Sequence, residues 1–210
     1  VAAGSLAVIT KTTPASQIIV RGVSGYKFAE ILLDAADSGE DVKITALTIT
    51  DTVGSAVPGN DLTNMTLKVD GVQYGDIEQP DGSTAGTADT TAFTLDTPIV
   101  VPAGESKTLE VYADVKASAT GDTSGTDADY THQINVDAAG DITTTGATTG
   151  ITIDEAVSGS GQDMYVYEKG SLTTVESASD PDAKIVAANS TGVTWNTYKF
   201  TPKYENVRLD

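Results

Sequence analysis

The chain has 210 residues, and its 30 Asp and Glu residues outnumber 12 Lys and Arg residues, which gives a formal net charge of -18 at pH 7. A surface this acidic repels phosphate backbones and anionic headgroups, so composition argues against nucleic-acid binding and membrane-surface roles. The chain has no Cys, which excludes disulfides, thiolate catalysis and zinc-thiolate sites. No apolar run approaches the roughly 20 residues of a membrane-spanning helix, so we expect no membrane insertion within this segment.

Alternation of apolar and polar residues predicts β-strands throughout, separated by Gly, Pro, Asn, Asp and Ser at intervals of roughly eight to twelve residues. In residues 41–50 the alternation changes phase near Ala46, which predicts a β-bulge. Residues 26–37 are the only stretch that also suits a helix, and we interpret them as a strand. The predicted strands are residues 5–10, 17–21, 26–34, 41–50, 65–71, 72–78, 92–96, 98–102, 107–116, 130–138, 149–154 and 164–169.

Many short strands without intervening helical patterns predict an all-β protein with an immunoglobulin-like β-sandwich fold. A closed barrel is the alternative. The clearest strand, residues 107–116, places Leu109, Val111 and Val115 on one face and Glu110 on the other. One buried and one wet face are typical of antiparallel sheets.

The end of the chain repeats its beginning. Counterparts in the two copies are Gly4-Ser5-Leu6 and Gly170-Ser171-Leu172, Pro14 and Pro181, Ile19-Val20 and Ile185-Val186, Gly25 and Gly192, Phe28 and Trp195, Ile31 and Tyr198, Leu33 and Phe200, and Glu40-Asp41-Val42-Lys43-Ile44 and Glu205-Asn206-Val207-Arg208-Leu209. Each matched type has a physical role: Gly and Pro suit turns or edges, and large apolar residues suit the inward face of a strand. Because the second copy contains Trp195 and Pro202, a strand suits residues 26–34 and their counterparts better than a helix.

The repeat predicts a β-sandwich domain at residues 1–168 and the first strands of a second, incomplete unit at residues 169–210. Residues 1–13 are a candidate linker or donor strand. A partial sandwich exposes an apolar face and unpaired edges. Two explanations therefore stay open: the chain is an excerpt of a longer tandem protein, or residues 169–210 complete a sheet in a neighbouring copy by strand exchange.

Three segments, residues 39–50, 60–71 and 100–115, together with the repeat, resemble the tandem immunoglobulin-like domains of prokaryotic cell-surface proteins, such as surface-layer proteins and extracellular filament subunits. The resemblance covers roughly the first 120 residues and the partial repeat. It implies an extracellular or cell-surface location and a load-bearing or lattice-forming role, with copies of the chain itself as partners.

Acidic loops of this composition predict calcium, because hard cations bind carboxylate and carbonyl oxygens. The sequence has no EF-hand spacing, so the candidates come from loops and from the repeat boundary. The alternative is that these acids are solvated surface residues. The candidate calcium ligands are Asp76, Asp81, Asp122, Asp127, Asp129, Glu176, Asp180 and Asp182.

No catalytic motif is recognisable, and we expect a protein that is not an enzyme. His132, the only histidine, is interpreted as an ordinary strand residue. Glycan acceptor triplets occur at Asn64 and Asn189. The leading hypothesis is a structural subunit of a surface layer or filament that acts by self-association, stabilised by calcium. The alternative hypothesis is an adhesin or carbohydrate-binding module of a larger secreted protein, which would require an exposed aromatic cluster.

Overall fold

A computed structural model describes residues 4–58, 61–80, 82, 84–123 and 128–210. The chain divides into two compact units, Val1–Glu168 (unit 1) and Lys169–Asp210 (unit 2). Nearly all of the regular structure described is β, apart from two short 3-10 turns, Ala128–Tyr130 and Ala139–Asp141. The prediction of an all-β fold is confirmed.

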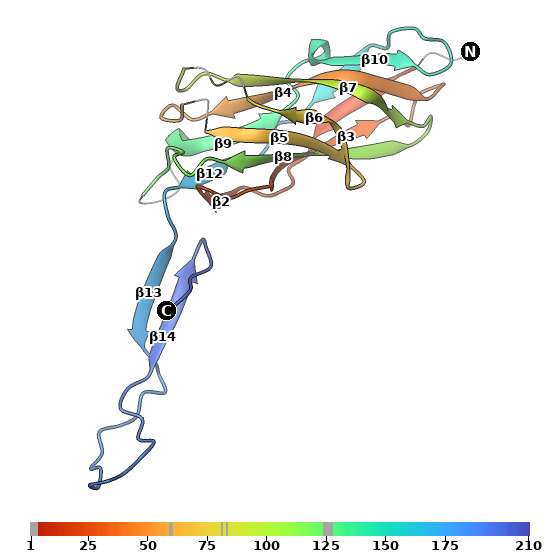
Figure 1. Ribbon diagram of the computed structural model, residues 1–210. Coiled ribbons are helices and arrows are strands. Elements are labelled where there is room, and N and C mark those ends of the chain that lie inside the picture. The colour runs from red at the N-terminus through yellow and green to blue at the C-terminus, as the bar shows by residue number, and fades with distance from the viewer. Residues whose placement is uncertain (1–3, 59–60, 81, 83, 124–127) are drawn as a thin grey trace. The chain divides into compact units, whose positions relative to one another are not determined.

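Unit 1 is a β-sandwich of two sheets stacked as layers (Figure 1). In spatial order the first sheet contains β11 (Glu155–Ser158), β1 (Leu6–Thr10), β3 (Tyr26–Asp34), β8 (Ser106–Val115), β5 (Leu62–Val69) and β6 (Val72–Glu78). The second sheet contains β10 (Ile142–Gly146), β4 (Val42–Val53), β9 (Thr131–Asn135), β12 (Met164–Tyr167) and β2 (Gln17–Val20), and β7 (Asp89–Val101) also pairs with β4.

The core lies between the inner faces of the two sheets. In β8, Leu109, Val111 and Val115 are buried as the alternation predicts, while Glu110 is only partly covered. Phe28 on β3 and Phe93 on β7 are the largest fully buried side chains. Alternation therefore identifies the inward face correctly, because successive side chains of a strand point to opposite faces of its sheet.

Two ambiguous segments behave as the sequence predicts. Residues Tyr26–Asp34 form a strand, β3, rather than a helix. The register between β4 and β7 shifts between Ile44 and Ala46, which is the predicted bulge. The extra residue explains why the alternation changes phase there.

One predicted strand is absent, and two other predicted strands form a single strand. Residues 149–154 are not a strand, because Gly150 has a positive φ of 68° and its N–H closes a turn onto the carbonyl of Gly146 at 2.9 Å. The strands instead flank this segment as β10 and β11. Residues 92–96 and 98–102, predicted as two strands, lie largely within the single strand β7, which crosses the bulge of β4 without ending.

The edges of the sandwich carry parallel pairs that alternation alone does not reveal. β11 pairs in parallel with β1, and β12 pairs in parallel with β2. Because parallel neighbours need a long crossover connection, both partners come from the last third of unit 1. Each of the first two strands therefore depends on residues more than a hundred positions later.

Candidate functional site: the C-terminal ribbon

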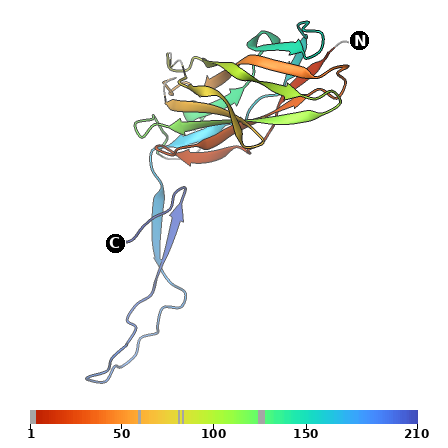
Figure 2. The same cartoon turned by 45° about the vertical axis from the view of Figure 1, so that its right-hand side comes forward.

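Unit 2 contains one antiparallel ribbon, β13 (Ser171–Glu176) paired with β14 (Tyr198–Lys203). Figure 2 shows these two strands side by side. Every residue of both strands is exposed. An isolated two-stranded ribbon is at best marginally stable in water. Its exposed faces and unpaired edges are therefore the candidate site for binding further strands.

The ribbon has the same pairing register as β1 and β3 under the counterparts that the sequence repeat defines. Adding 166 to a β1 position and 167 to a β3 position gives the ribbon position in every case. The corresponding pairs are Ala7–Asp34 and Thr173–Thr201, Val8–Leu33 and Thr174–Phe200, Ile9–Leu32 and Val175–Lys199, and Thr10–Ile31 and Glu176–Tyr198. Because a slip of one residue would turn every side chain to the opposite face, the shared register places counterparts on corresponding faces.

Details outside the ladder agree with this equivalence. Beyond β1, the N–H of Lys11 donates to the carbonyl of Glu30 at 2.8 Å. Beyond β13, the N–H of Ser177 donates to the carbonyl of Thr197 at 2.7 Å, between the counterparts of those two residues. Gly25 and Gly192, also counterparts, have φ angles of 62° and 70°. Both positions therefore need the left-handed conformation that glycine adopts without a steric cost.

The two ribbons differ in what covers them. Phe28 is 1 % exposed in unit 1, whereas its counterpart Trp195 is 78 % exposed. Ile31 is fully buried, whereas Tyr198 is 53 % exposed. The ribbon of unit 2 thus presents large apolar side chains at positions that form the core of unit 1.

The strand edges are also unpartnered. In unit 1, β1 lies between β11 and β3, and β3 lies between β1 and β8. In the part of the chain that the structure describes, β13 and β14 pair only with each other. Each ribbon strand therefore offers one row of backbone N–H and C=O groups for further pairing.

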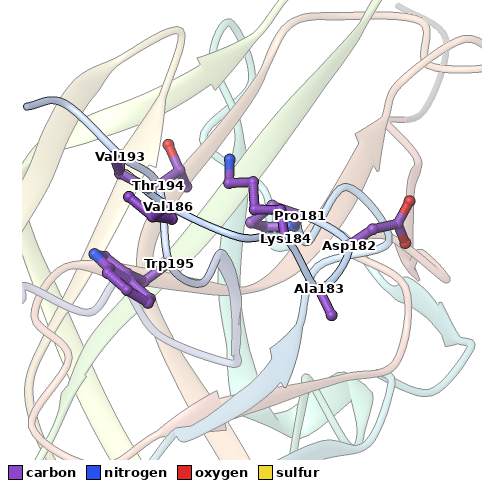
Figure 3. A pocket seen from close by; sticks show the side chains of 8 residues that line it. All are labelled: Pro181, Asp182, Ala183, Lys184, Val186, Val193, Thr194 and Trp195. Carbon is purple, nitrogen blue, oxygen red and sulfur yellow. The ribbon is translucent and has the colours of Figure 1, made fainter. Parts of the chain in front are cut away.

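A shallow pocket of about 190 Å³ lies in the segment that connects β13 to β14. Figure 3 shows Val186, Val193 and Trp195 at one side of it and Pro181, Asp182 and Lys184 at the other. The counterpart segment of unit 1 contains β2, whose Ile19 is buried, whereas Ile185 is exposed. The pocket is thus a place where apolar side chains lack the packing that the counterpart segment has.

The predicted calcium ligands do not converge among the described residues, where no group of three His, Asp or Glu side chains is placed to hold a metal ion. Asp81 and Asp127 lie outside the described residues. Asp76 is exposed on β6, and Asp129 accepts a hydrogen bond from Ser55 Oγ at 2.5 Å. Asp122 is buried and pairs through its backbone with β12. Calcium binding stays a prediction.

The acids of unit 2 have local partners. Asp180 Oδ1 accepts a hydrogen bond from the N–H of Thr197 at 2.7 Å. Glu176 Oε1 accepts one from Asn196 Nδ2 at 3.5 Å. Asp182 is exposed at the rim of the pocket. Asp180 and Glu176 thus connect β13 and the segment after it to the residues that lead into β14.

A buried polar pair in unit 1 was not predicted. His132 Nδ1 lies 2.7 Å from Asp51 Oδ2, and both side chains are almost completely buried. Burial lowers the pKa of His132, but the charge of Asp51 and the hydrogen bond to it outweigh burial and raise this pKa above its ordinary value. The pair connects β4 to β9 within the core. The alternation of residues 130–138 places His132 inward, but no sequence signal identifies Asp51 as its partner.

No family model matches the sequence. No curated protein sequence matches it either. Solved structures with a similar fold include that of AvmM, which catalyzes macrocyclization in alchivemycin A biosynthesis, at 16 % identity and a TM-score of 0.37, covering 78 % of this chain and 89 % of that one.

Two further similar structures are cohesins. One is a complex that contains CaCohA2, at 10 % identity and a TM-score of 0.31, covering 78 % of this chain and 99 % of that one. The other is the seventh ScaB type I cohesin from Pseudobacteroides cellulosolvens, at 9 % identity and a TM-score of 0.30, covering 88 % of this chain and 99 % of that one. These similarities concern the fold alone.

The prediction that the chain is not an enzyme is corrected by these comparisons. It rested on the absence of recognisable catalytic motifs. AvmM, one of the proteins with a similar fold, is a catalyst of macrocyclization. The prediction is withdrawn. Separately, none of the helical segments described is long and apolar enough to cross a bilayer.

Proposed function

We propose that the chain is a repeated structural module of an extracellular assembly, in which β-sandwiches follow one another along the polypeptide and copies associate with each other. Unit 1 is one complete sandwich of this array, and unit 2 is the opening ribbon of the next. The observation that carries the proposal is the shared pairing register of β1–β3 and β13–β14. Two ribbons with one pairing register turn counterpart positions to the same face, so each is suited to partner strands on that face.

The exposed side chains of the ribbon support this function energetically. Burying one large apolar side chain stabilises a fold by about 1.5–3 kcal/mol. Trp195, Tyr198 and Phe200 are exposed, and so are Leu172 and Val175 on β13. Completing the second sandwich would bury those that face inward and would pair both open strand edges.

Composition supports the extracellular location. A net charge of -18 keeps the surface hydrated, and the absence of Cys suits a protein stabilised by a large core. The first sheet of unit 1 also ends at β6, which lies near β7 of the second sheet and on which Val72 and Ile77 are exposed. An edge of this kind is suited to pairing between copies, and it is the part of unit 1 through which we expect lateral association.

Electron microscopy and sedimentation velocity of the purified chain test the proposal, with and without calcium. We expect ordered sheets or fibres that grow with protein concentration. The control is Val72→Lys, which places a charge on the β6 edge and should reduce association without unfolding unit 1. Dispersed monomers at every protein and calcium concentration would contradict self-association.

A carbohydrate-binding or adhesive function is the second candidate, because it requires exposed aromatic side chains and the ribbon has them. Trp195 in particular lies beside a pocket. Titration of tryptophan fluorescence with oligosaccharides separates the two candidates, since Trp195 is the only tryptophan. A saturable change, with calorimetric oligosaccharide binding that is lost in Trp195→Phe, would favour the second candidate, and no change would favour the structural one.

A further inference from the structure

Glu40 lies between β3 of the first sheet and β4 of the second sheet, and its side chain binds a turn that is distant in the sequence. Its side chain is 7 % exposed. Glu40 Oε2 accepts hydrogen bonds from the N–H groups of Thr148 and Thr149, both at 2.9 Å, and Oε1 accepts one from Thr149 Oγ1 at 2.7 Å. Three donors from one turn thus converge on one carboxylate, and such charge-assisted hydrogen bonds are the strong ones.

The turn that reaches Glu40 has a specific composition. A Cβ at Gly146 would collide with the Glu40 carboxylate, so a side chain there would displace the carboxylate from its donors. Two residues further, Thr148 and Thr149 supply the donors, and the N–H of Gly150 closes the turn onto the carbonyl of Gly146. The turn Gly-Ala-Thr-Thr-Gly at residues 146–150 is therefore the part of unit 1 that binds the Glu40 carboxylate.

Glu205 is the counterpart of Glu40, and it also lies close to the first residue of its repeat copy, Gly170. Glu205 Oε1 accepts a hydrogen bond from the N–H of Gly170 at 2.8 Å. A Cβ at Gly170 would overlap the Glu205 side chain, whereas a Cβ at its counterpart Gly4 would collide with Ile153 and only touch Glu40. Glu205 is exposed, and its Oε2 has no donor among the residues described in unit 2.

The residues after Glu205 indicate where the missing donors come from. In unit 1, Glu40 is followed by β4, which begins with buried Val42 and Ile44. Val207 and Leu209 occupy the counterpart positions and are exposed. They already carry the alternation of β4, although no strand forms there, because strands equivalent to β7, β9 and β10 are needed as neighbours. The partner strands are therefore expected on the same polypeptide.

We propose that Glu205 is the receptor site for a Gly-x-Thr-Thr-type turn, which the same polypeptide supplies when strands equivalent to those of residues 41–168 complete the second sandwich. This inference rests on the proposed tandem function and names the partner of the ribbon. The partner's turn must donate two consecutive backbone N–H groups and a hydroxyl to the Glu205 carboxylate. It must also have a glycine where a side chain would collide with that carboxylate, as unit 1 has Gly146 beside Glu40. Its following strand must pair in parallel with β13, as β11 does with β1.

A fusion protein tests the inference: the full chain through Glu205, followed directly by a second copy of residues 41–168. The second copy then supplies the turn, while Glu205 takes the place of Glu40. A matched control fuses residues 1–168 directly to residues 41–168, so that the second copy has no ribbon. We expect two folded sandwiches in the first fusion, a single folded sandwich in the control, and a monomer in sedimentation velocity.

Hydrogen exchange then reads the site itself. In the fusion, Glu205→Gln should speed the exchange of the two threonine amides in the second copy's turn by at least about tenfold, and leave Thr148 and Thr149 unchanged. Glu40→Gln should speed the exchange of the Thr148 and Thr149 amides and leave the threonine amides of the second copy unchanged. Unchanged exchange in Glu205→Gln, with both sandwiches folded, would overturn the inference and leave the tandem function standing.

The larger side chains of the ribbon require one more variant. Trp195→Phe, Tyr198→Ile and Phe200→Leu together restore the unit 1 residues at these three positions in the fusion and remove their mismatch of size. If the second copy stays unfolded even then, the tandem function fails with the inference. If it folds only in dimers, or if the control without the ribbon folds equally well, the proposed partner on the same polypeptide is wrong.

Discussion

The β1–β3 pair of unit 1 and the β13–β14 ribbon have the same register, the same terminal hydrogen bond and the same glycine conformation, yet one is buried and the other is exposed. Local sequence thus determines how two strands pair with each other. Burial depends on strands outside the pair, namely β8 and β11 of the first sheet and the strands of the second sheet, most of which are distant in the sequence. The comparison separates the local part of folding from the part that only tertiary contacts supply.

The largest expected effect comes from truncating the same position in the two ribbons. Phe28→Ala should lower the free energy of unfolding of unit 1 by about 3–5 kcal/mol, because it leaves a cavity in a closed core. Trp195→Ala should change it by no more than about 0.5 kcal/mol, because the side chain is exposed. Urea unfolding followed by circular dichroism measures both values. Similar losses in the two variants would show that the ribbon is already packed.

A second prediction concerns the buried pair that only the complete unit has. Asp51→Ala should lower the free energy of unfolding by about 3 kcal/mol, because it leaves His132 buried without its partner. The pKa of His132 is raised in the folded state, so the pair stabilises unit 1 fully below the unfolded pKa of about 6.5 and loses its effect as pH rises through the folded pKa.

Chemical denaturation between pH 5 and pH 9 checks the sign of this effect. The wild-type chain should lose stability as pH rises through the folded pKa of His132, and His132→Gln should lose that component of the pH dependence. A pH profile that is identical in the two proteins would show that the imidazole does not titrate with folding.

A smaller effect is expected for the two glutamates. Hydrogen bonds from Thr149, first its hydroxyl and then its N–H, lower the pKa of Glu40. A lowered pKa in the folded state gives stability that is present above the unfolded pKa and is lost as pH falls through the folded pKa. Glu40→Gln should lower the melting temperature of unit 1 at pH 7 by about 2–4 °C and weaken its acid dependence.

Glu205→Gln is the matched control for this prediction. Glu205 is exposed, and among the residues that the structure describes Gly170 is its single donor, so its substitution should leave the melting temperature unchanged. Differential scanning calorimetry at pH 7 and pH 4 compares the two variants. An equal decrease of the melting temperature in both variants would contradict the expectation that Glu40, with three donors, stabilises the chain more than Glu205, with one.

The smallest expected effect is that of calcium. If carboxylates such as Asp76 or Asp122 bind it, excess calcium should raise the melting temperature of the chain and a chelator should reverse the rise, because a ligand that binds the folded state stabilises it. Magnesium serves as the control cation. A melting temperature that neither calcium nor chelator changes would remove the calcium prediction.

Part of the fold could be predicted because it depends on local patterns. The alternation in β8 identifies its inward face, and the phase change at Ala46 identifies the bulge of β4. The repeat further supplies the counterparts of β1 and β3 on which the register comparison depends. These features need only the geometry of a strand, in which neighbouring side chains point to opposite faces.

The sites could not be predicted in the same way. The hydrogen bonds between Glu40 and Thr149 join residues 109 positions apart, and the one between Asp51 and His132 joins residues 81 positions apart. Neither pair has a characteristic spacing, and each depends on the order of strands in a sheet. The calcium prediction had the same weakness, since many acidic loops in a sequence do not show which carboxylates lie together.

The sequence by itself determined that the protein is all-β, which side chains of its strands face inward, and that its last residues repeat its first. Only the tertiary structure decided which strands are neighbours, that β1 and β3 are buried while β13 and β14 are exposed, and that Glu40 receives a turn that Glu205 lacks. The physical reason is that the preference of a strand is local, whereas burial and hydrogen bonding to a carboxylate require groups that the chain brings together only when the sheets close.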